Sequence, residues 1–335
     1  MKRILVVLTC LLMVVACGHK TTTSTKRGSS GKTLEVLLVA DKETYSGDTK
    51  NLIDSLFRRP QAGMPQIEPI FDLVNIPVSS FRNTEMFQVH RNVIICDINP
   101  ENPNKVYFHT DQHAEPQVVF DFAVTDRNKL EELLKKYEKR IIEDIYATEH
   151  RRMYNVFKAI EGVEIREAIK KQFGFSMIFS NEFEIAKPNN PEPDFMWIRK
   201  ETKDFGIGVL IHVAPYNSQK QFEESVILNN LDTLMRHHVP CSAPESYMGT
   251  ERRLDFTTQP VKFENNSYCI ETRGCWRAFG DFMGGPFVTY TLASPDNNQI
   301  VTLTGYVYYP SGRIKNLSKR DLLMQVEGIC HTLKF

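Results

Sequence analysis

Aromatic and charged side chains that could bind a ligand gather in the last quarter of the chain: Trp276, Arg277, Asp281, Phe282, Tyr306 and Tyr308. Flat rings beside charges are typical of surfaces that bind a peptide, a glycan or a partner protein. Core packing of a sheet beneath helices is the alternative for the same rings. The tyrosines fall on the polar side of an alternating strand, which favours exposure for them.

Short catalytic motifs are absent from the sequence. It contains no Gly-x-Ser-x-Gly elbow, phosphate-binding loop, dinucleotide fingerprint or His-Glu-x-x-His pair. The three glycines between Gly280 and Gly285 match no phosphate-binding pattern and indicate a loop between two strands. We therefore expect no cofactor and name no catalytic residue.

The histidines do not predict a metal site. His237 and His238 fall at the end of an expected helix, where adjacent side chains point about 100° apart and would not face one ion. A favourable interaction with the helix C-terminus explains them more simply. His109 and His113 are four residues apart, but in a strand that runs into a loop.

The amino-terminal segment predicts export and lipid attachment. Lys2 and Arg3 precede an apolar run, residues 4–15, which as a helix would span about 18 Å. That is too short for a hydrocarbon core of about 30 Å and is typical of a secretory signal. The run ends in Val14-Val15-Ala16-Cys17, which resembles a bacterial lipobox. We expect residues 1–16 to be removed and Cys17 to be acylated, with palmitate or a similar chain, as a stable anchor in the lipid membrane.

The residues after Cys17 predict the location. Gly18 follows the cysteine, and under the usual sorting rule of Gram-negative lipoproteins the lack of Asp there indicates the outer membrane. Residues 17–32 are rich in Ser, Thr, Gly and Lys and are expected to form a flexible tether. No acidic run follows Cys17, which favours the periplasmic side over the outer surface.

Five cysteines remain after processing: Cys96, Cys241, Cys269, Cys275 and Cys330. An odd number prevents complete pairing, and the oxidising periplasm permits disulfides without specifying any. Cys269 and Cys275 would lie about 20 Å apart on one straight strand. They could pair only if Thr272-Arg273-Gly274 formed a turn, and buried free thiols are the alternative.

Composition and periodicity predict a two-domain α+β protein. The 335 residues are 41% hydrophobic, with 41 basic and 41 acidic side chains, which excludes a disordered chain and gives no sign of nucleic-acid binding. Residues 33–173 are expected to form a first domain that ends in a long helical region capped by Asp126. Residues 174–335 form the second, with capping boxes at Ser218 and Ser318. Each domain is expected to hold a mainly antiparallel sheet flanked by helices.

Three segments support a family resemblance. They are Ile198–Lys203 leading to Ala214-Pro215-Tyr216, the stretch Gly280–Pro286, and the lipobox. With these the chain resembles an uncharacterised lipoprotein family of the Bacteroidota, a domain of unknown function that brings no catalytic residues. The element order after Gly174 is also similar to the α/β/α sandwich of PsbP-type proteins, which are mostly non-enzymatic accessory subunits.

These observations together favour a membrane-anchored periplasmic binding or accessory protein without enzymatic activity. Its partner would be an envelope protein, a peptide or a glycan, and not a nucleic acid. An envelope hydrolase with a dispersed active site is the first alternative, and a purely structural envelope component is the second.

Overall fold

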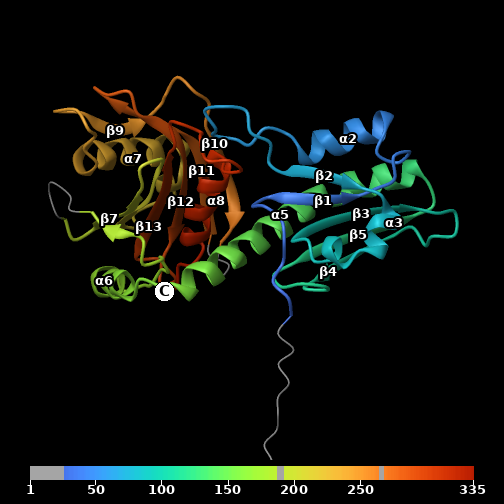
Figure 1. Ribbon diagram of the computed structural model, residues 1–335. Coiled ribbons are helices and arrows are strands. Elements are labelled where there is room, and N and C mark those ends of the chain that lie inside the picture. The colour runs from blue at the N-terminus through green and yellow to red at the C-terminus, as the bar shows by residue number, and fades with distance from the viewer. Residues whose placement is uncertain (1–25, 187–191, 264–267) are drawn as a thin grey trace, which may run out of the picture.

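The computed structural model describes residues 26–186, 192–263 and 268–335. Two β-sheets lie side by side in Figure 1, and the long helix α5 runs between them. The predicted α+β class with two domains is confirmed. Residues 1–25, and with them the signal peptide and Cys17, lie outside the described residues.

The first sheet is mostly parallel. Its order is β2-β1-β3-β5-β4, and only β4 pairs antiparallel with its neighbour. The expectation of a mainly antiparallel sheet is therefore wrong for this domain. Helices between β1 and β2 and between β2 and β3 return the chain to the same edge, and such crossovers produce parallel pairing. The elements are β1 (Glu35–Val39), α2 (Gly47–Phe57), β2 (Asp72–Ile76), α3 (Val78–Asn83), α4 (Glu85–Gln88), β3 (Asn92–Ile98), β4 (Lys105–Thr110) and β5 (Val118–Val124).

Helix α5 (Arg127–Ala159) contributes to both domains. Asp126 caps it as predicted, because its carboxylate accepts a hydrogen bond from the Lys129 amide at 3.0 Å. At 1.5 Å per residue, its 33 residues span about 50 Å. Leu130 and Ile141 pack in the core of the first sheet, and Phe157 packs in the core of the second. The next helix, α6 (Val163–Phe173), was assigned to the first domain from sequence, but its Ile165 and Ile169 pack in the second core.

The second sheet is antiparallel throughout its described pairings, as expected. Its order is β10-β11-β12-β13-β8-β7-β6, with β9 on the end of β11. The stretch 175–179, at the start of this domain, makes one isolated bridge, between Ser176 and Lys334. The strands are β6 (Glu184–Ile185), β7 (Phe195–Glu201), β8 (Gly206–Pro215), β9 (Tyr247–Thr250), β10 (Thr257–Lys262), β11 (Tyr268–Phe279), β12 (Gly284–Ala293) and β13 (Gln299–Tyr308).

Helices cover both faces of the second sheet. The short 3-10 helix η1 (Gln219–Phe222) follows the Ser218 capping box and leads into α7 (Glu224–His238), which covers one face with Leu228, Leu231 and Met235. Helix α8 (Lys319–Cys330) covers the other face, and Ser318 and Asp321 form its predicted capping box. Apolar residues on both faces of the sheet are thus packed against helices.

A buried charge cluster joins α8 to the sheet. The guanidinium of Arg273 on β11 donates two hydrogen bonds to Glu271 and two to Glu327 of α8, each at 2.8 Å. All three side chains are at least nine-tenths buried. Burial alone would raise the pKa of Glu327, but Arg273 outweighs it and lowers the pKa to about 2. Glu327 is thus ionised in the folded protein at neutral pH.

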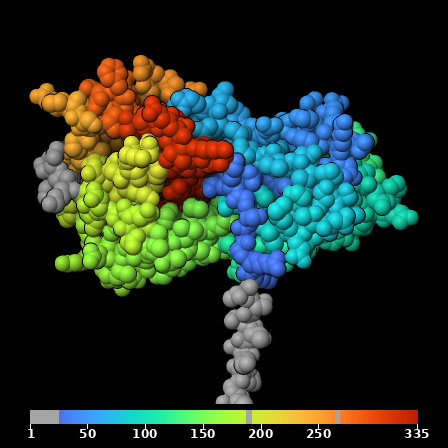
Figure 2. Space-filling model, in the orientation of Figure 1, coloured from blue at the N-terminus to red at the C-terminus, as the bar shows by residue number. Residues whose placement is uncertain are grey.

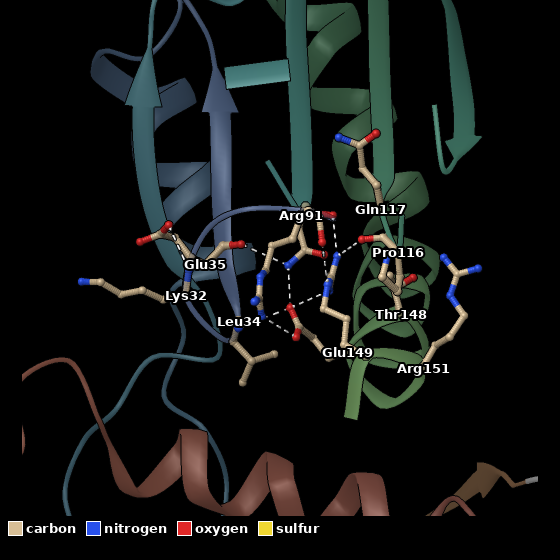
Figure 3. A network of polar contacts seen from close by, with 12 residues as sticks. Lys32, Leu34, Glu35, Arg91, Pro116, Gln117, Thr148, Glu149 and Arg151 are labelled. Atoms are coloured by element: carbon tan, nitrogen blue, oxygen red, sulfur yellow. Dashed lines mark hydrogen bonds and ion pairs between the residues drawn. The ribbon is translucent and has the colours of Figure 1, made fainter. Parts of the chain in front are cut away.

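A second buried network fixes α5 to the first sheet (Figure 3). Glu149 of α5 is fully buried and accepts hydrogen bonds from Arg91 at 2.9 Å, from the Asn92 amide group at 2.9 Å and from the Leu34 backbone at 3.4 Å. Arg152, three residues further along α5, donates hydrogen bonds to the Arg91 and Pro116 carbonyls. One helix is thereby held against the ends of β1, β3 and β5.

The described part of the expected tether is bound to the domain. Ser30 exchanges backbone hydrogen bonds with Val89 and Arg91, both at 2.9 Å, and the Ser29 hydroxyl accepts one from Arg152 at 3.1 Å. These contacts use backbone amides and a hydroxyl, which a flexible Gly/Ser composition does not reveal. The ordered fold therefore begins before residue 33.

The two domains meet along α5 and α8. Figure 2 shows the red C-terminal segment and the blue start of the described chain together between the two lobes. Arg320 of α8 pairs with Asp72 of β2 at 2.7 Å, and Met324 packs in the core of the first sheet. At Gly328 the helices come so close that an added Cβ would lie 2.5 Å from the Met153 side chain.

Candidate binding surface at the end of the second sheet

Trp276 and Tyr306 belong to the core, with exposed fractions of 3% and 5%. The indole of Trp276 donates to the Val307 carbonyl at 3.0 Å, and the indole of Trp197 donates to the Tyr306 hydroxyl at 3.0 Å. Tyr308 is half-buried, with its ring 6.2 Å from that of Trp276. The expectation that Trp276 and Tyr306 form an exposed binding surface is therefore wrong, because α7 covers that side of the strand.

The tip of the β11–β12 hairpin exposes one large ring. Phe282 is completely exposed, at 106% of its reference area. Gly280, at φ 85°, allows the tight turn before it. Asp281 accepts hydrogen bonds from the Phe282 amide at 2.7 Å and from the Ala243 amide at 3.3 Å. Its carboxylate thus joins the hairpin tip to the loop that follows α7, and Phe282 projects from a supported turn.

Beside the tip, two arginines enclose two stacked rings. Tyr247 of β9 and Phe279 of β11 face each other across a registered pair, with ring centroids 5.2 Å apart. Arg236 of α7 lies over Tyr247 at 5.0 Å, and Arg277 lies over Phe279 at 4.9 Å. We call Arg236, Tyr247, Phe279 and Arg277 the arginine–aromatic stack. Sequence reasoning missed Arg236 and Tyr247, since only the β9–β11 pairing brings them to the hairpin.

A shallow depression of about 690 Å³ adjoins the stack, and residues 240–247 form much of its wall. Arg236 and His237 line it from α7. Cys241 also lines it, but burial, together with Asp281, raises the pKa of this thiol to about 11. A thiol that is protonated at neutral pH is a poor nucleophile. The geometry therefore suits a non-covalent contact in which this surface supplies cationic, aromatic and apolar groups.

A smaller hollow of about 200 Å³ lies on the first sheet, beside α3. It is lined by Arg82, His109, His113 and Asp121, among others. Burial raises the pKa of Asp121, and Asp97 raises it further, whereas burial lowers the pKa of His113. Arg82 is paired with Asp97 at 2.9 Å. Sequence reasoning had noted His109 and His113 but did not place them in a cavity.

The cysteines with described coordinates are all free. Cys269 and Cys275 lie on the single strand β11, as the straight-strand alternative required. Burial raises the pKa of Cys96 to about 12 and that of Cys275 to about 11, and it raises those of Cys269 and Cys330 further. These thiols behave as small core side chains.

One described cluster has the composition of a metal site: Glu192, His237 and His238, whose candidate ligand atoms all lie within 4.8 Å of one another. The argument that adjacent histidines cannot face one ion is wrong here. Nδ1 of His237 and Nε2 of His238 lie 3.4 Å apart, because different ring nitrogens turn toward each other at the end of the helix.

Fold and site together define a two-domain α+β protein with a shallow cationic and aromatic surface on its second domain. The chain belongs to the family described as Domain of unknown function (DUF4837), whose model matches residues 163–332. A second model, also a domain of unknown function (DUF8532), matches residues 29–158.

Other comparisons add little. No curated protein matches the chain. A thioesterase from Haemophilus influenzae matches at 8% identity over 44% of this chain and 91% of its own chain. Its TM-score of 0.14 is too low to indicate a shared fold. No helix in the described ranges is long and apolar enough to cross a membrane.

Proposed function

We propose that this protein is a lipid-anchored binding protein of the bacterial envelope that captures a partner protein with the tip of its β11–β12 hairpin. The anchor is Cys17, in the outer membrane and facing the periplasm. The support for this address is the lipobox-like sequence and the following Gly18. Membership of a Bacteroidota lipoprotein family and the likeness to PsbP-type accessory subunits belong to the same proposal.

The exposure of Phe282 carries the binding proposal. A fully exposed phenylalanine forgoes roughly 1.5–3 kcal/mol that burial would provide. Asp281 and Gly280 nevertheless hold it at the tip of an ordered turn. Aromatic and arginine side chains are the usual centres of binding energy in interfaces, and Arg277 and Arg236 lie beside it in the arginine–aromatic stack.

The charges near the tip indicate the partner. Both oxygens of Asp281 accept backbone hydrogen bonds, so this carboxylate is already engaged within the chain. The guanidinium groups of Arg236 and Arg277 stack on rings that are themselves partly exposed. The matching surface is an apolar pocket that admits Phe282 and carries acidic groups at its rim.

Location on the molecule fits this role. In Figure 1, α7 and β9 lie at the upper left of the second domain, and the described chain begins at the lower edge, between the domains. A partner at the hairpin would therefore lie away from the start of the described chain, residue 26 onward.

The test is capture from envelope extract by the purified full chain. We expect Phe282→Ala to reduce recovery of the partner at least about tenfold, a change of about 1.4 kcal/mol. Its melting temperature should be unchanged. Ile67→Ala is the matched control, because Ile67 is 87% exposed in the first domain. Equal recovery by Phe282→Ala and wild type would overturn the proposal.

Two further measurements test the membrane location separately from the binding of a partner. Cys17→Ala should move the protein from the membrane fraction to the soluble fraction, and unchanged fractionation would refute the anchor. If the Cys17→Ala chain binds phosphatidylethanolamine–phosphatidylglycerol vesicles and Phe282→Ala abolishes this, the tip inserts into lipid and the protein-partner proposal is wrong.

A further inference from the structure

Helix α7 ends with two histidines that face a carboxylate from a distant segment. Nδ1 of His237 lies 3.6 Å from Oε1 of Glu192, and Nε2 of His238 lies 3.5 Å from Oε2 of the same side chain. The two ring nitrogens are 3.4 Å apart. The two nitrogens thus face the two oxygens of one carboxylate, and one candidate ligand atom from each of the three side chains lies within 4.8 Å of the others.

The spacing of these ligand atoms suits a small tetrahedral ion. With bonds of about 2.0–2.1 Å, a tetrahedral zinc ion separates its ligand atoms by about 3.3–3.4 Å. The two imidazole nitrogens are 3.4 Å apart, and each lies 3.5 or 3.6 Å from its nearer oxygen of the Glu192 carboxylate. Two imidazoles and one carboxylate are also a ligand set that zinc and neighbouring transition metals accept, whereas calcium and magnesium prefer oxygen alone.

The surrounding structure holds both sides of the cluster in place. The ring of His238 is buried and stacks on Phe195, with centroids 4.1 Å apart and planes 12° from parallel. On the opposite side, the Gln172 amide group of α6 donates to the Pro193 carbonyl at 3.1 Å and to the Phe195 carbonyl at 3.0 Å. The backbone next to Glu192 is therefore fixed without the Glu192 carboxylate taking part.

Electrostatics and access also favour a cation here. His237 and His238 occupy the last turn of α7, and the carbonyl end of a helix carries partial negative charge. Glu192 adds a carboxylate whose side chain is 42% exposed, and the His237 side chain is 50% exposed. An ion from solution can therefore approach the cluster past these two exposed side chains.

We propose that Glu192, His237 and His238 form a binding site for a divalent transition-metal ion, with zinc as the best fit. The three side chains supply two nitrogens and one carboxylate, and solvent completes the coordination. The site adjoins the depression next to the arginine–aromatic stack, because His237 lines both. The proposal does not depend on the proposed function, since it concerns the ion alone.

The experiment is zinc titration of the full chain, purified without a histidine tag and stripped with EDTA. Competition with a chromophoric chelator should give one high-affinity zinc per chain, with a Kd of about 1 µM or lower. Cobalt substituted at the same site should give the intense visible absorption of tetrahedral Co²⁺.

Glu192→Gln and His237→Ala should each weaken zinc binding at least about tenfold. Both side chains are substantially exposed, so both variants should fold, which circular dichroism verifies. His109→Ala removes a histidine of the first domain and should bind like wild type. The proposal would be overturned if the wild type did not bind zinc. It would also be overturned if Glu192→Gln and His237→Ala bound zinc as tightly as the wild type, since the zinc would then bind other groups such as the thiols.

Discussion

Replacing Glu327 with glutamine should remove a pH-dependent part of the stability. The carboxylate accepts two 2.8 Å hydrogen bonds from Arg273 inside the protein, and its pKa is lowered from 4.5 to about 2. That difference corresponds to about 3 kcal/mol of stability at pH 7. It agrees with the roughly 3–5 kcal/mol lost when one partner of a buried ion pair is removed.

The pH dependence follows from the direction of the shift. A carboxylate with a lowered pKa stabilises the folded state fully above its unfolded pKa of 4.5 and loses that contribution as the pH falls toward 2. At pH 3 the difference between wild type and Glu327→Gln should therefore be about half of its value at pH 7 or less.

Urea unfolding followed by circular dichroism at both pH values measures these differences. At pH 7 the melting temperature of Glu327→Gln should also fall, by roughly 6–12 °C for a folding domain of about 150–250 residues. Glu101→Gln, in an exposed loop of the first domain, is the control and should change stability by less than about 0.5 kcal/mol. A difference below about 1 kcal/mol at pH 7, or one that is the same at pH 3, would refute the reasoning.

Two further predictions concern buried groups of the second domain. Tyr306→Phe removes the acceptor for the Trp197 indole and should lower the free energy of unfolding by about 1–3 kcal/mol. Tyr308→Phe is the control and should lower it less, because its ring is only half-buried. Equal effects in thermal or urea unfolding would contradict the assigned hydrogen bond. Maleimide labelling, mapped by mass spectrometry, should modify the half-buried Cys241 before Cys330, because the Cys330 thiol is fully buried and its pKa is raised. Rapid labelling of Cys330 in the native protein would contradict its place in the core.

Local signals in the sequence predicted local structure. The Ser318 capping box and the Asp126 cap form as expected, because each depends on residues within one helical turn. Alternation along the last strand also predicted which residues share a face: Leu303 packs toward α8, and Tyr306 lies on the other side.

Features that depend on distant segments could not be predicted in the same way. The alternation of β13 did not indicate that α7 would cover the tyrosine side, so Tyr306 was expected at the surface. The parallel first sheet depends on pairing between strands more than twenty residues apart, and the sequence signal for it was the helix between β1 and β2. The cluster of Glu192, His237 and His238 likewise joins the segment before β7 to the end of α7.

Gly328 has a consequence for how this protein can be divided. Its missing side chain lets α8 lie against Met153 of α5, so the last helix of one domain is seated on the linking helix of the other. A chain cut near residue 160, between the segments that match the two family models, would leave the first core without Met324 and the second core without Phe157. We therefore expect each half expressed alone to be less stable than the full chain, and we expect a side chain introduced at position 328 to weaken the contact between α5 and α8.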